Sequence, residues 1–282
     1  MKGKEHTLRE RPGTEHAGTE HAGTEHAGKV TLVTGATGGI GRAVVHALAE
    51  AGASVAAVDL DTAALEELER TAGDKGLSVT GFPADVTSAA RVEAVIATVE
   101  ERLGPIDQLV NTAGVLRAAP ALSLTEEDWE QTFAVNAAGV FRVSTAVARR
   151  MKRHGRRGSI VTVASNAAVV PRVHMAAYAA SKAAAVAFTK NLGLELARDG
   201  IRCNAVCPGS TDTPMLRSLW EDESGPAHSL DGVLSEYRVG IPLGKFATPG
   251  DIADAVAFLL SDRAAHITMH DLHVDGGAAL GR

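Results

Sequence analysis

From residue 29 onward, short apolar runs alternate with segments whose apolar residues recur at helical spacing. The apolar runs cover residues 29–34, 54–59, 77–82, 109–111, 159–164, 201–206 and 272–274, and the helical patterns cover 40–51, 62–72, 88–103, 126–150, 175–198 and 251–260. Strands that alternate with helices form parallel sheets whose two faces are covered by those helices. The sequence therefore predicts an α/β fold with a single doubly wound, Rossmann-like parallel sheet, and a polar, irregular segment over 209–243.

The beginning of the chain differs from the rest. Residues 13–27 repeat Gly-Thr-Glu-His-Ala three times, and a period of five matches neither a helix face nor a strand face. We expect residues 1–28 to be a low-complexity, disordered extension and residues 29–282 to be one dinucleotide-binding catalytic domain. The repeat histidines, His16, His21 and His26, invite a metal-binding interpretation. A mobile polar tail is the simpler interpretation, and we expect no metal.

Charge and hydropathy disfavour several classes of function. The chain has 28 Lys and Arg against 34 Asp and Glu, a net charge of −6, which argues against nucleic acid as a partner because such a partner needs a basic surface. With no uninterrupted apolar stretch of about 18 residues, no membrane span is expected. Cys203 and Cys207 lie too far apart in an extended segment to form a disulfide. Reduced thiols are typical of a cytoplasmic protein.

A glycine-rich turn separates the first apolar run from the first helical pattern. Residues 34–41 read Thr-Gly-Ala-Thr-Gly-Gly-Ile-Gly, and such a turn lets a diphosphate approach the N-terminus of the next helix. Asp59 ends the second run and is followed by Leu60 and Asp61 rather than by a basic residue. A carboxylate there can bind both hydroxyls of an adenosine ribose and would repel a 2′-phosphate. The turn favours this interpretation over a simple cap, and the predicted cofactor is NAD.

Tyr178 and Lys182 are four residues apart in the helical pattern of 175–198, so they share one helix face. A tyrosine is a poor base, with an ordinary pKa of about 10, and a nearby ammonium group lowers that pKa. Ser165 follows the fifth apolar run, at the edge of the sheet where ligands bind, and its hydroxyl can hold a substrate oxygen. An exposed Tyr–Lys pair is common, but the glycine turn and the serine favour a catalytic group.

Together these motifs resemble the short-chain dehydrogenase/reductase family. The resemblance rests on the glycine turn, Asn-Thr-Ala-Gly at 111–114, Ser165, Tyr-Ala-Ala-Ser-Lys at 178–182 and Pro-Gly at 208–209, with Thr112 where the family usually has alanine. It covers about residue 29 to the end of the chain and implies hydride transfer at a carbinol or carbonyl carbon. In this pattern Tyr178 would be the acid/base, Lys182 would bind the nicotinamide ribose and lower the tyrosine pKa, and Ser165 would orient the substrate. Asn136 matches the asparagine that supports a water relay to the lysine.

The resemblance also implies the residues that hold the cofactor. Asp85 and Val86 match the adenine contact, and the segment at 111–114 matches the nicotinamide side. The full set comprises Gly35, Thr37, Gly39, Ile40, Gly41, Asp59, Asp85, Val86, Asn111, Ala113, Gly114, Tyr178, Lys182, Pro208, Gly209, Thr211 and Thr213. The family resemblance further implies a homotetramer.

Longer stretches are similar to one branch of that family, the enzymes that oxidise 2,3-dihydro-2,3-dihydroxybenzoate for catecholate siderophores. They lie at 113–117, 162–166, 171–172, 209–215, 219–220, 241–245 and 266–281. Such a substrate is a cyclohexadiene diol carrying a carboxylate. Arg117 and Arg172 follow predicted strand ends, and either can bind a carboxylate. The alternative for each is a solvated arginine on a loop. Met215, Leu219 and Trp220 would wall an apolar ring, unless they form a lid that packs on its own core.

The expected reaction is therefore NAD-dependent oxidation of a cyclohexadiene carboxylate to an aromatic product, 2,3-dihydroxybenzoate, in siderophore or secondary metabolism. One alternative places an amine beside the reacting hydroxyl, so that 2,3-dihydro-3-hydroxyanthranilate gives 3-hydroxyanthranilate. Another is a nucleotide-binding scaffold without activity, which the intact Ser165, Tyr178 and Lys182 argue against. A 3-ketoacyl reductase would want NADPH and a basic residue near the glycine turn.

Overall fold

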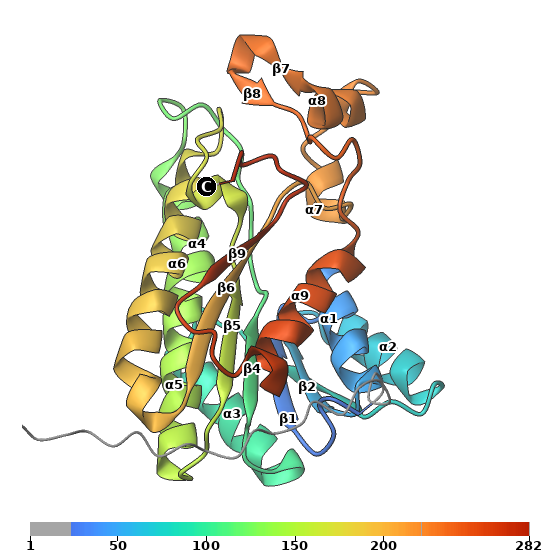
Figure 1. The fold of residues 1–282 in the computed structure, drawn as a ribbon, viewed down its shortest axis with the longest axis vertical. Helices are drawn as coiled ribbons and strands as arrows, with labels where there is room; N and C mark the ends of the chain where they lie inside the picture. The colour runs from blue at the N-terminus through green and yellow to red at the C-terminus, as the bar shows by residue number, and fades with distance from the viewer. Residues whose placement is uncertain (1–23, 221, 282) are drawn as a thin grey trace, which may run out of the picture.

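A parallel sheet organises the computed structural model, which describes residues 24–220 and 222–281 (Figure 1). Within these residues the sheet has seven strands in the order β3-β2-β1-β4-β5-β6-β9, and every neighbouring pair is parallel. The strands are β1 (Val30–Thr34), β2 (Ser54–Asp59), β3 (Val79–Pro83), β4 (Gln108–Asn111), β5 (Ser159–Val163), β6 (Arg202–Pro208) and β9 (Asp271–Val274). The order reverses direction between β1 and β4, where ligands bind in doubly wound folds.

Helices cover both faces of the sheet (Figure 1). On one face lie α1 (Gly39–Glu50), α2 (Thr62–Gly73) and α9 (Pro249–Leu260). On the other lie α3 (Ala89–Leu103), α4 (Glu126–Phe133), α5 (Val140–Arg153) and α6 (Ala176–Leu196). Each face has its own apolar core, one around Leu48 and Val256 and the other around Ile96 and Val147. The central strands are apolar on both faces because both are buried, which confirms the predicted α/β architecture.

Two predicted segments differ in the structure. The pattern at 126–150 predicted one continuous helix, but a π-helical turn, Ala134–Gly139, separates α4 from α5. Such turns insert an extra residue without breaking the helical pattern and are frequent at functional sites. The segment 209–243, expected to be irregular, contains α7 (Pro214–Arg217), α8 (Gly225–Asp231) and a hairpin of β7 (Gly232–Val233) with β8 (Arg238–Val239). These elements lie beyond the carboxyl ends of the strands (Figure 1).

The folded part of the chain begins before the expected boundary at residue 29. Residues 24–28 form a turn in which His26 is only 1% exposed. Nδ1 of His26 lies 3.1 Å from Nε2 of Gln108 in β4. The amide of His26 donates to the carbonyl of Ala51. The expected disorder is therefore wrong for residues 24–28, since this turn packs on the domain. For residues 1–23, including His16 and His21, the expectation lies outside the described residues.

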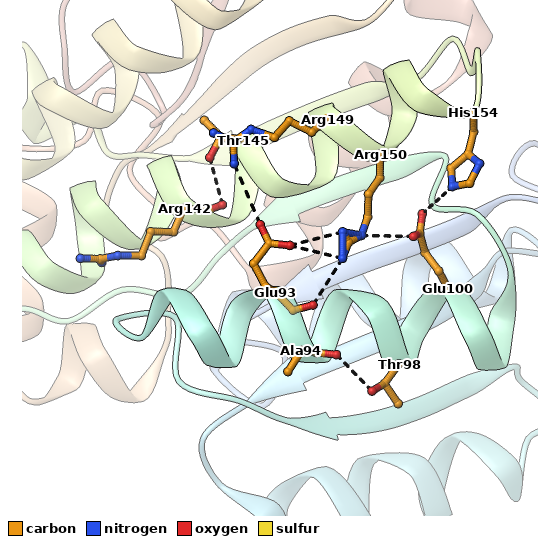
Figure 2. A network of polar contacts seen from close by, with 9 residues as sticks. All are labelled: Glu93, Ala94, Thr98, Glu100, Arg142, Thr145, Arg149, Arg150 and His154. Atoms are coloured by element: carbon orange, nitrogen blue, oxygen red, sulfur yellow. Dashed lines mark hydrogen bonds and ion pairs between the residues drawn. The ribbon is translucent and has the colours of Figure 1, made fainter.

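Charged side chains join α3 to α5 on the second face (Figure 2). Arg150 pairs with Glu93 at 3.3 Å and with Glu100 at 3.1 Å, and Glu100 also lies 3.3 Å from His154. The Arg150 side chain is 12% exposed, whereas Arg149 on the same helix is 69% exposed and lies 4.0 Å from Glu93. Half-buried charges therefore fix the position of α5, the helix that follows the π-helical turn.

Over residues 24–220 and 222–281, we find no helix that combines the length and the apolarity needed to cross a membrane.

Candidate active site

The turn between β1 and α1 requires glycine because the backbone packs closely at two of its positions. Gly35 has φ of +63°, and a Cβ there would lie 2.6 Å from Cα of Ala113. A Cβ on Gly41 would lie 2.0 Å from the carbonyl oxygen of Gly35. The N-cap of α1, Gly38, gives no side-chain hydrogen bond to the first turn of the helix. Its amides therefore remain available to an anion such as a diphosphate, so this turn fits a dinucleotide.

Asp59 at the end of β2 borders this turn. One carboxylate oxygen accepts from the amide of Thr37 at 3.0 Å, and the other accepts from the amide of Leu60 at 2.7 Å. The second oxygen also accepts from the amide of Asp61 at 3.4 Å, whereas the oxygen facing Thr37 keeps a lone pair for a further donor. The carboxylate is thus held in place beside the glycine turn, where the predicted contact with a ribose requires it.

The end of β3 carries the residues predicted for the adenine side. Asp85 accepts from both the amide and the hydroxyl of Thr87 at 2.7 Å, which shapes the turn into α3. A Cβ on Gly139 would lie 3.0 Å from a methyl carbon of Val86. Val86 therefore packs against the π-helical turn, and its contact links the cofactor side of the sheet to the catalytic side.

The strand β4 ends beside the predicted catalytic group. The side chain of Asn111 lies in the interior, where its amide donates to the hydroxyl of Ser144 at 2.9 Å. The hydroxyl of Thr112 donates to the carbonyl of Thr34 and so ties β4 to β1. A Cβ on Gly114 would lie 3.3 Å from Nζ of Lys182. Threonine therefore fits at position 112, where the family usually has alanine, and its hydroxyl adds a hydrogen bond between β4 and β1.

Tyr178 and Lys182 lie on α6 as predicted, and both are buried. Nζ of Lys182 donates to the carbonyl of Val163 at 2.9 Å and lies 5.7 Å from the centre of the Tyr178 ring. Ser165 begins the turn after β5, and its Oγ accepts from the amide of Ala167 at 3.1 Å. The structure therefore brings together the three side chains that the sequence placed on two separate elements.

The pKa of Tyr178 differs from the sequence-based expectation. Burial raises the pKa of Tyr178, and its hydrogen bond with Ser165 only partly opposes that rise. Burial also lowers the pKa of Lys182 to about 8. The lysine was expected to lower the tyrosine pKa, but burial of the Tyr178 hydroxyl has the larger effect, because a phenolate is costly at a buried position.

Asn136 lies in the π-helical turn and connects β4 to α6. Its side-chain oxygen Oδ1 accepts from the backbone amide of Val115 at 2.9 Å. Its side-chain nitrogen Nδ2 donates to the backbone carbonyl of Val115 at 2.9 Å and to the hydroxyl of Ser181 at 3.0 Å. The side chain is fully buried. Asn136 thereby fixes the segment after β4 against the helix that carries Tyr178 and Lys182.

A cavity of about 500 Å³ opens above Ser165 and Tyr178, a size that suits a small ligand. Its lining contains the predicted Ile40, Ser165, Arg172, Tyr178, Pro208, Gly209, Thr211, Thr213, Met215, Leu219 and Trp220. The other predicted residues are outside the lining: Gly35, Thr37, Gly39, Gly41, Asp59, Asp85, Val86, Asn111, Ala113, Gly114, Asn136 and Lys182. Met215, Leu219 and Trp220 come from α7 and the residues after it, so the expected apolar wall faces the cavity.

The structure does not bring Arg117, one of the two arginines predicted to bind the substrate carboxylate, into the lining of the cavity. Its side chain is 54% exposed and lies 3.6 Å from the carboxylate of Asp128 at the start of α4. The loop after β4 borders the cavity through Leu116 and Ala118, whereas the side chain of Arg117 between them lies beside α4. Sequence reasoning also missed Arg238, which lines the cavity from β8. No periodic pattern marks the hairpin, and its only signal was a basic residue in a polar segment.

Comparisons with known proteins agree with this geometry. A family model described as enoyl-(acyl carrier protein) reductase matches residues 35–279. The 2,3-dihydro-2,3-dihydroxybenzoate dehydrogenase of Bacillus subtilis (strain 168) is 55% identical over 253 residues, 90% of this chain and 97% of that protein. The enzyme of the same name from Escherichia coli (strain K12) is 44% identical over 254 residues, 88% of this chain and 96% of that protein.

A solved structure gives the same result for the fold. The gluconate 5-dehydrogenase of Burkholderia cenocepacia J2315, in complex with NADP and tartrate, superposes with a TM-score of 0.83 at 33% identity. The match covers 90% of this chain and 96% of that one.

Proposed function

Because the chain belongs to the short-chain dehydrogenase/reductase family, we propose that it oxidises 2,3-dihydro-2,3-dihydroxybenzoate to 2,3-dihydroxybenzoate with NAD⁺. One observation carries the proposal. The hydroxyls of Ser165 and Tyr178 meet at a cavity whose other walls combine apolar side chains with arginine. A ring that bears both hydroxyls and a carboxylate fits that lining. The 55% identity with a dehydrogenase of this name supports the same substrate.

The residues around the glycine turn would hold the cofactor. The free amides at the start of α1 suit the diphosphate, and the Asp59 carboxylate suits the ribose hydroxyls of NAD rather than the phosphate of NADP. Gly39 lies so close to Thr213 that a Cβ on it would be 2.8 Å from the threonine methyl carbon. Bound NAD⁺ supplies the hydride acceptor for the reaction.

The protein's own side chains handle the proton. Ser165 orients the hydroxyl on C3 of the substrate, and Tyr178 accepts its proton as the C–H bond at that carbon breaks. Lys182 and Asn136 hold the tyrosine's helix and the segment after β4 in position through Val163 and Val115. Because burial raises the pKa of Tyr178, its proton transfer depends on the positive charges that surround it in the assembled site.

The product leaves the reaction as an aromatic ring. Loss of hydride and proton gives a ketone, which tautomerises to the catechol by moving one proton from carbon to oxygen. Aromatisation makes the oxidation effectively irreversible. An NAD-preferring site suits that direction.

The resemblance to the family also implies a homotetramer in the cytoplasm, and both belong to this proposal. Trp129 of α4 and Phe141 of α5 are 42% and 50% exposed. An assembly over these helices would cover apolar surface that a single chain leaves in water.

The test is turnover of the dihydrodiol by the purified protein with NAD⁺. We expect catechol fluorescence and NADH absorbance to rise together. Replacement of Tyr178 by Phe removes the proton acceptor and should lower kcat by about 100-fold or more. The matched control is Tyr237→Phe, because Tyr237 is 95% exposed and that variant should keep full activity.

Two outcomes would contradict the proposal. A wild-type protein that binds NAD⁺ but oxidises no dihydrodiol would favour a scaffold, and a Tyr178→Phe variant with full turnover would exclude the mechanism. The relative kcat/KM on 2,3-dihydro-3-hydroxyanthranilate decides between the hydroxyl and the amine at C2.

A further inference from the structure

Two guanidinium groups line the cavity from different elements. Arg172 lies in the loop between β5 and α6, and Arg238 begins β8 of the hairpin that lies beyond the sheet (Figure 1). Burial lowers the pKa of both arginines, and the like charge of Arg238 lowers that of Arg172 further. The two cations are therefore close enough to repel each other across the cavity.

No carboxylate pairs with either arginine in the part of the chain that the structure describes. Asp275 lies nearest in charge to Arg172, but its oxygens accept from Asn166 at 3.1 Å and from the amides of Gly277 and Ala279 at 3.0 and 2.8 Å. Nε of Arg238 is buried without a hydrogen-bond partner among the same residues. Glu236 also lines the cavity and raises the pKa of Arg238, but among the described residues it forms no ion pair with that arginine. A half-buried guanidinium without a paired anion is costly, so the two arginines favour an anionic ligand.

The first arginine is fixed by its neighbours. Nη2 of Arg172 donates to the amide oxygen of Asn166 at 3.4 Å, and Asn166 is held by Asp275. These hydrogen bonds tie Arg172 to the residues that follow β5 and β9 of the sheet, whereas Arg238 lies on the β7–β8 hairpin. The site therefore has one side anchored to the sheet and one side carried by the segment above it.

We propose that Arg172 and Arg238 together bind the carboxylate of the substrate, with Arg238 supplied by the β7–β8 hairpin. The inference rests on the proposed function, because that function supplies the carboxylate. Two guanidinium forks can satisfy both oxygens of one carboxylate and cancel their mutual repulsion. A diol of the same ring without the carboxylate leaves both cations unpaired, so the pair selects the acid and draws the hairpin toward the sheet.

The experiment compares two ligands that differ only in the carboxylate. Calorimetric titrations with saturating NAD⁺ measure the Kd of 2,3-dihydroxybenzoate and of catechol for the wild type, Arg238→Gln, Arg238→Lys and Arg172→Gln. We expect each glutamine variant to raise the Kd of the acid by about 10- to 100-fold and to change that of catechol by less than about twofold. The lysine variant, which keeps the charge, should lose less. Arg149→Gln, which changes an exposed arginine of α5, is the matched control and should bind both ligands as the wild type does.

Turnover of the dihydrodiol separates this inference from the proposed function. In the glutamine variants KM should rise while kcat changes little. Unchanged binding of the acid by Arg238→Gln, in a protein whose near-ultraviolet circular dichroism and NAD⁺ affinity are those of the wild type, would overturn the arginine pair. Equal weakening of acid and catechol would overturn it too. A wild type that binds the acid through both arginines but oxidises no dihydrodiol would overturn the proposed function and leave the carboxylate site standing.

Discussion

At the scale of single residues, Asp59 combines a structural role with a selective one. Its two oxygens accept from the amides of Thr37 and Leu60, so these hydrogen bonds fix the position of the carboxylate beside the glycine turn. A fixed negative charge disfavours a second negative charge beside it more strongly than a mobile one would. The preference for NAD follows from this charge.

Replacement of Asp59 by Asn keeps an acceptor for the backbone amides and removes the charge. The ratio of kcat/KM with NAD⁺ to that with NADP⁺ should fall by about tenfold or more, because repulsion of the 2′-phosphate disappears. Steady-state rates with both cofactors measure the ratio. Asp61→Asn is the control: Asp61 caps α2 through the amide of Ala64, asparagine caps equally well, and its ratio should stay within about twofold. An unchanged ratio for Asp59→Asn would mean that another group sets the preference.

Spacing along the chain was enough to predict some site residues and not others. Tyr178 and Lys182 are four residues apart and therefore share a face wherever the helix begins. Ser165 follows a buried strand, so it lies at the carboxyl edge of the parallel sheet. Arg238 is different, since it reaches the cavity through a short hairpin with no periodic signal. The rise in the Tyr178 pKa was equally hidden, because burial depends on residues far away in the sequence.

At the scale of elements, strands and long helices were predictable from hydrophobic periodicity, because each buries one or both faces. The π-helical turn at Ala134–Gly139 was not predictable, since the sequence continues a helical pattern before and after it. The polar contacts of Arg150 with Glu93 and Glu100 hold α5, the helix that follows this turn, against α3 (Figure 2).

Arg150→Met should therefore weaken the protein more than a neighbouring change of the same kind. Arg150 is 12% exposed and pairs with Glu93 and Glu100. Its loss leaves Glu93 only the longer contact with Arg149 and Glu100 only the contact with His154, and should cost about 1–3 kcal/mol of unfolding free energy. Arg149→Met removes a side chain that is 69% exposed and should cost less than about 1 kcal/mol. Urea unfolding of both variants at equal protein concentration checks this. Equal losses would show that the pairs with Arg150 do not stabilise the helix.

At the scale of the whole molecule, the cavity and the turn at residues 24–28 lie at opposite ends of the sheet. The cavity is lined by residues that follow the carboxyl ends of β5 and β6, whereas His26 contacts Gln108, the first residue of β4. Composition assigned His26 to the extension because the repeat has no apolar periodicity, and only tertiary packing reveals its burial.

The pH dependence of stability should report His26. Burial lowers the pKa of His26 from its ordinary value of 6.5, although Glu25, the Gln108 hydrogen bond, a backbone bond to Ala257 and Asp262 oppose the shift. As the pH falls below 6.5, the unfolded chain binds a proton that the folded protein resists, so the unfolding free energy decreases. Urea unfolding between pH 7 and 5 should show a steeper loss for the wild type than for His26→Asn. The exposed His266 provides the control, since His266→Asn should lose stability as steeply as the wild type; parallel curves for all three proteins would contradict the prediction.

The position of the turn at residues 24–28 has a practical consequence. Because this turn is pinned at the amino ends of the strands, whatever is joined to the chain ahead of it starts from the side of the molecule opposite the substrate entrance. Anchoring the enzyme to a resin, or fusing it to a partner that feeds it substrate, through its amino terminus would then leave the entrance unobstructed. The carboxyl terminus, by contrast, follows β9 toward the entrance (Figure 1).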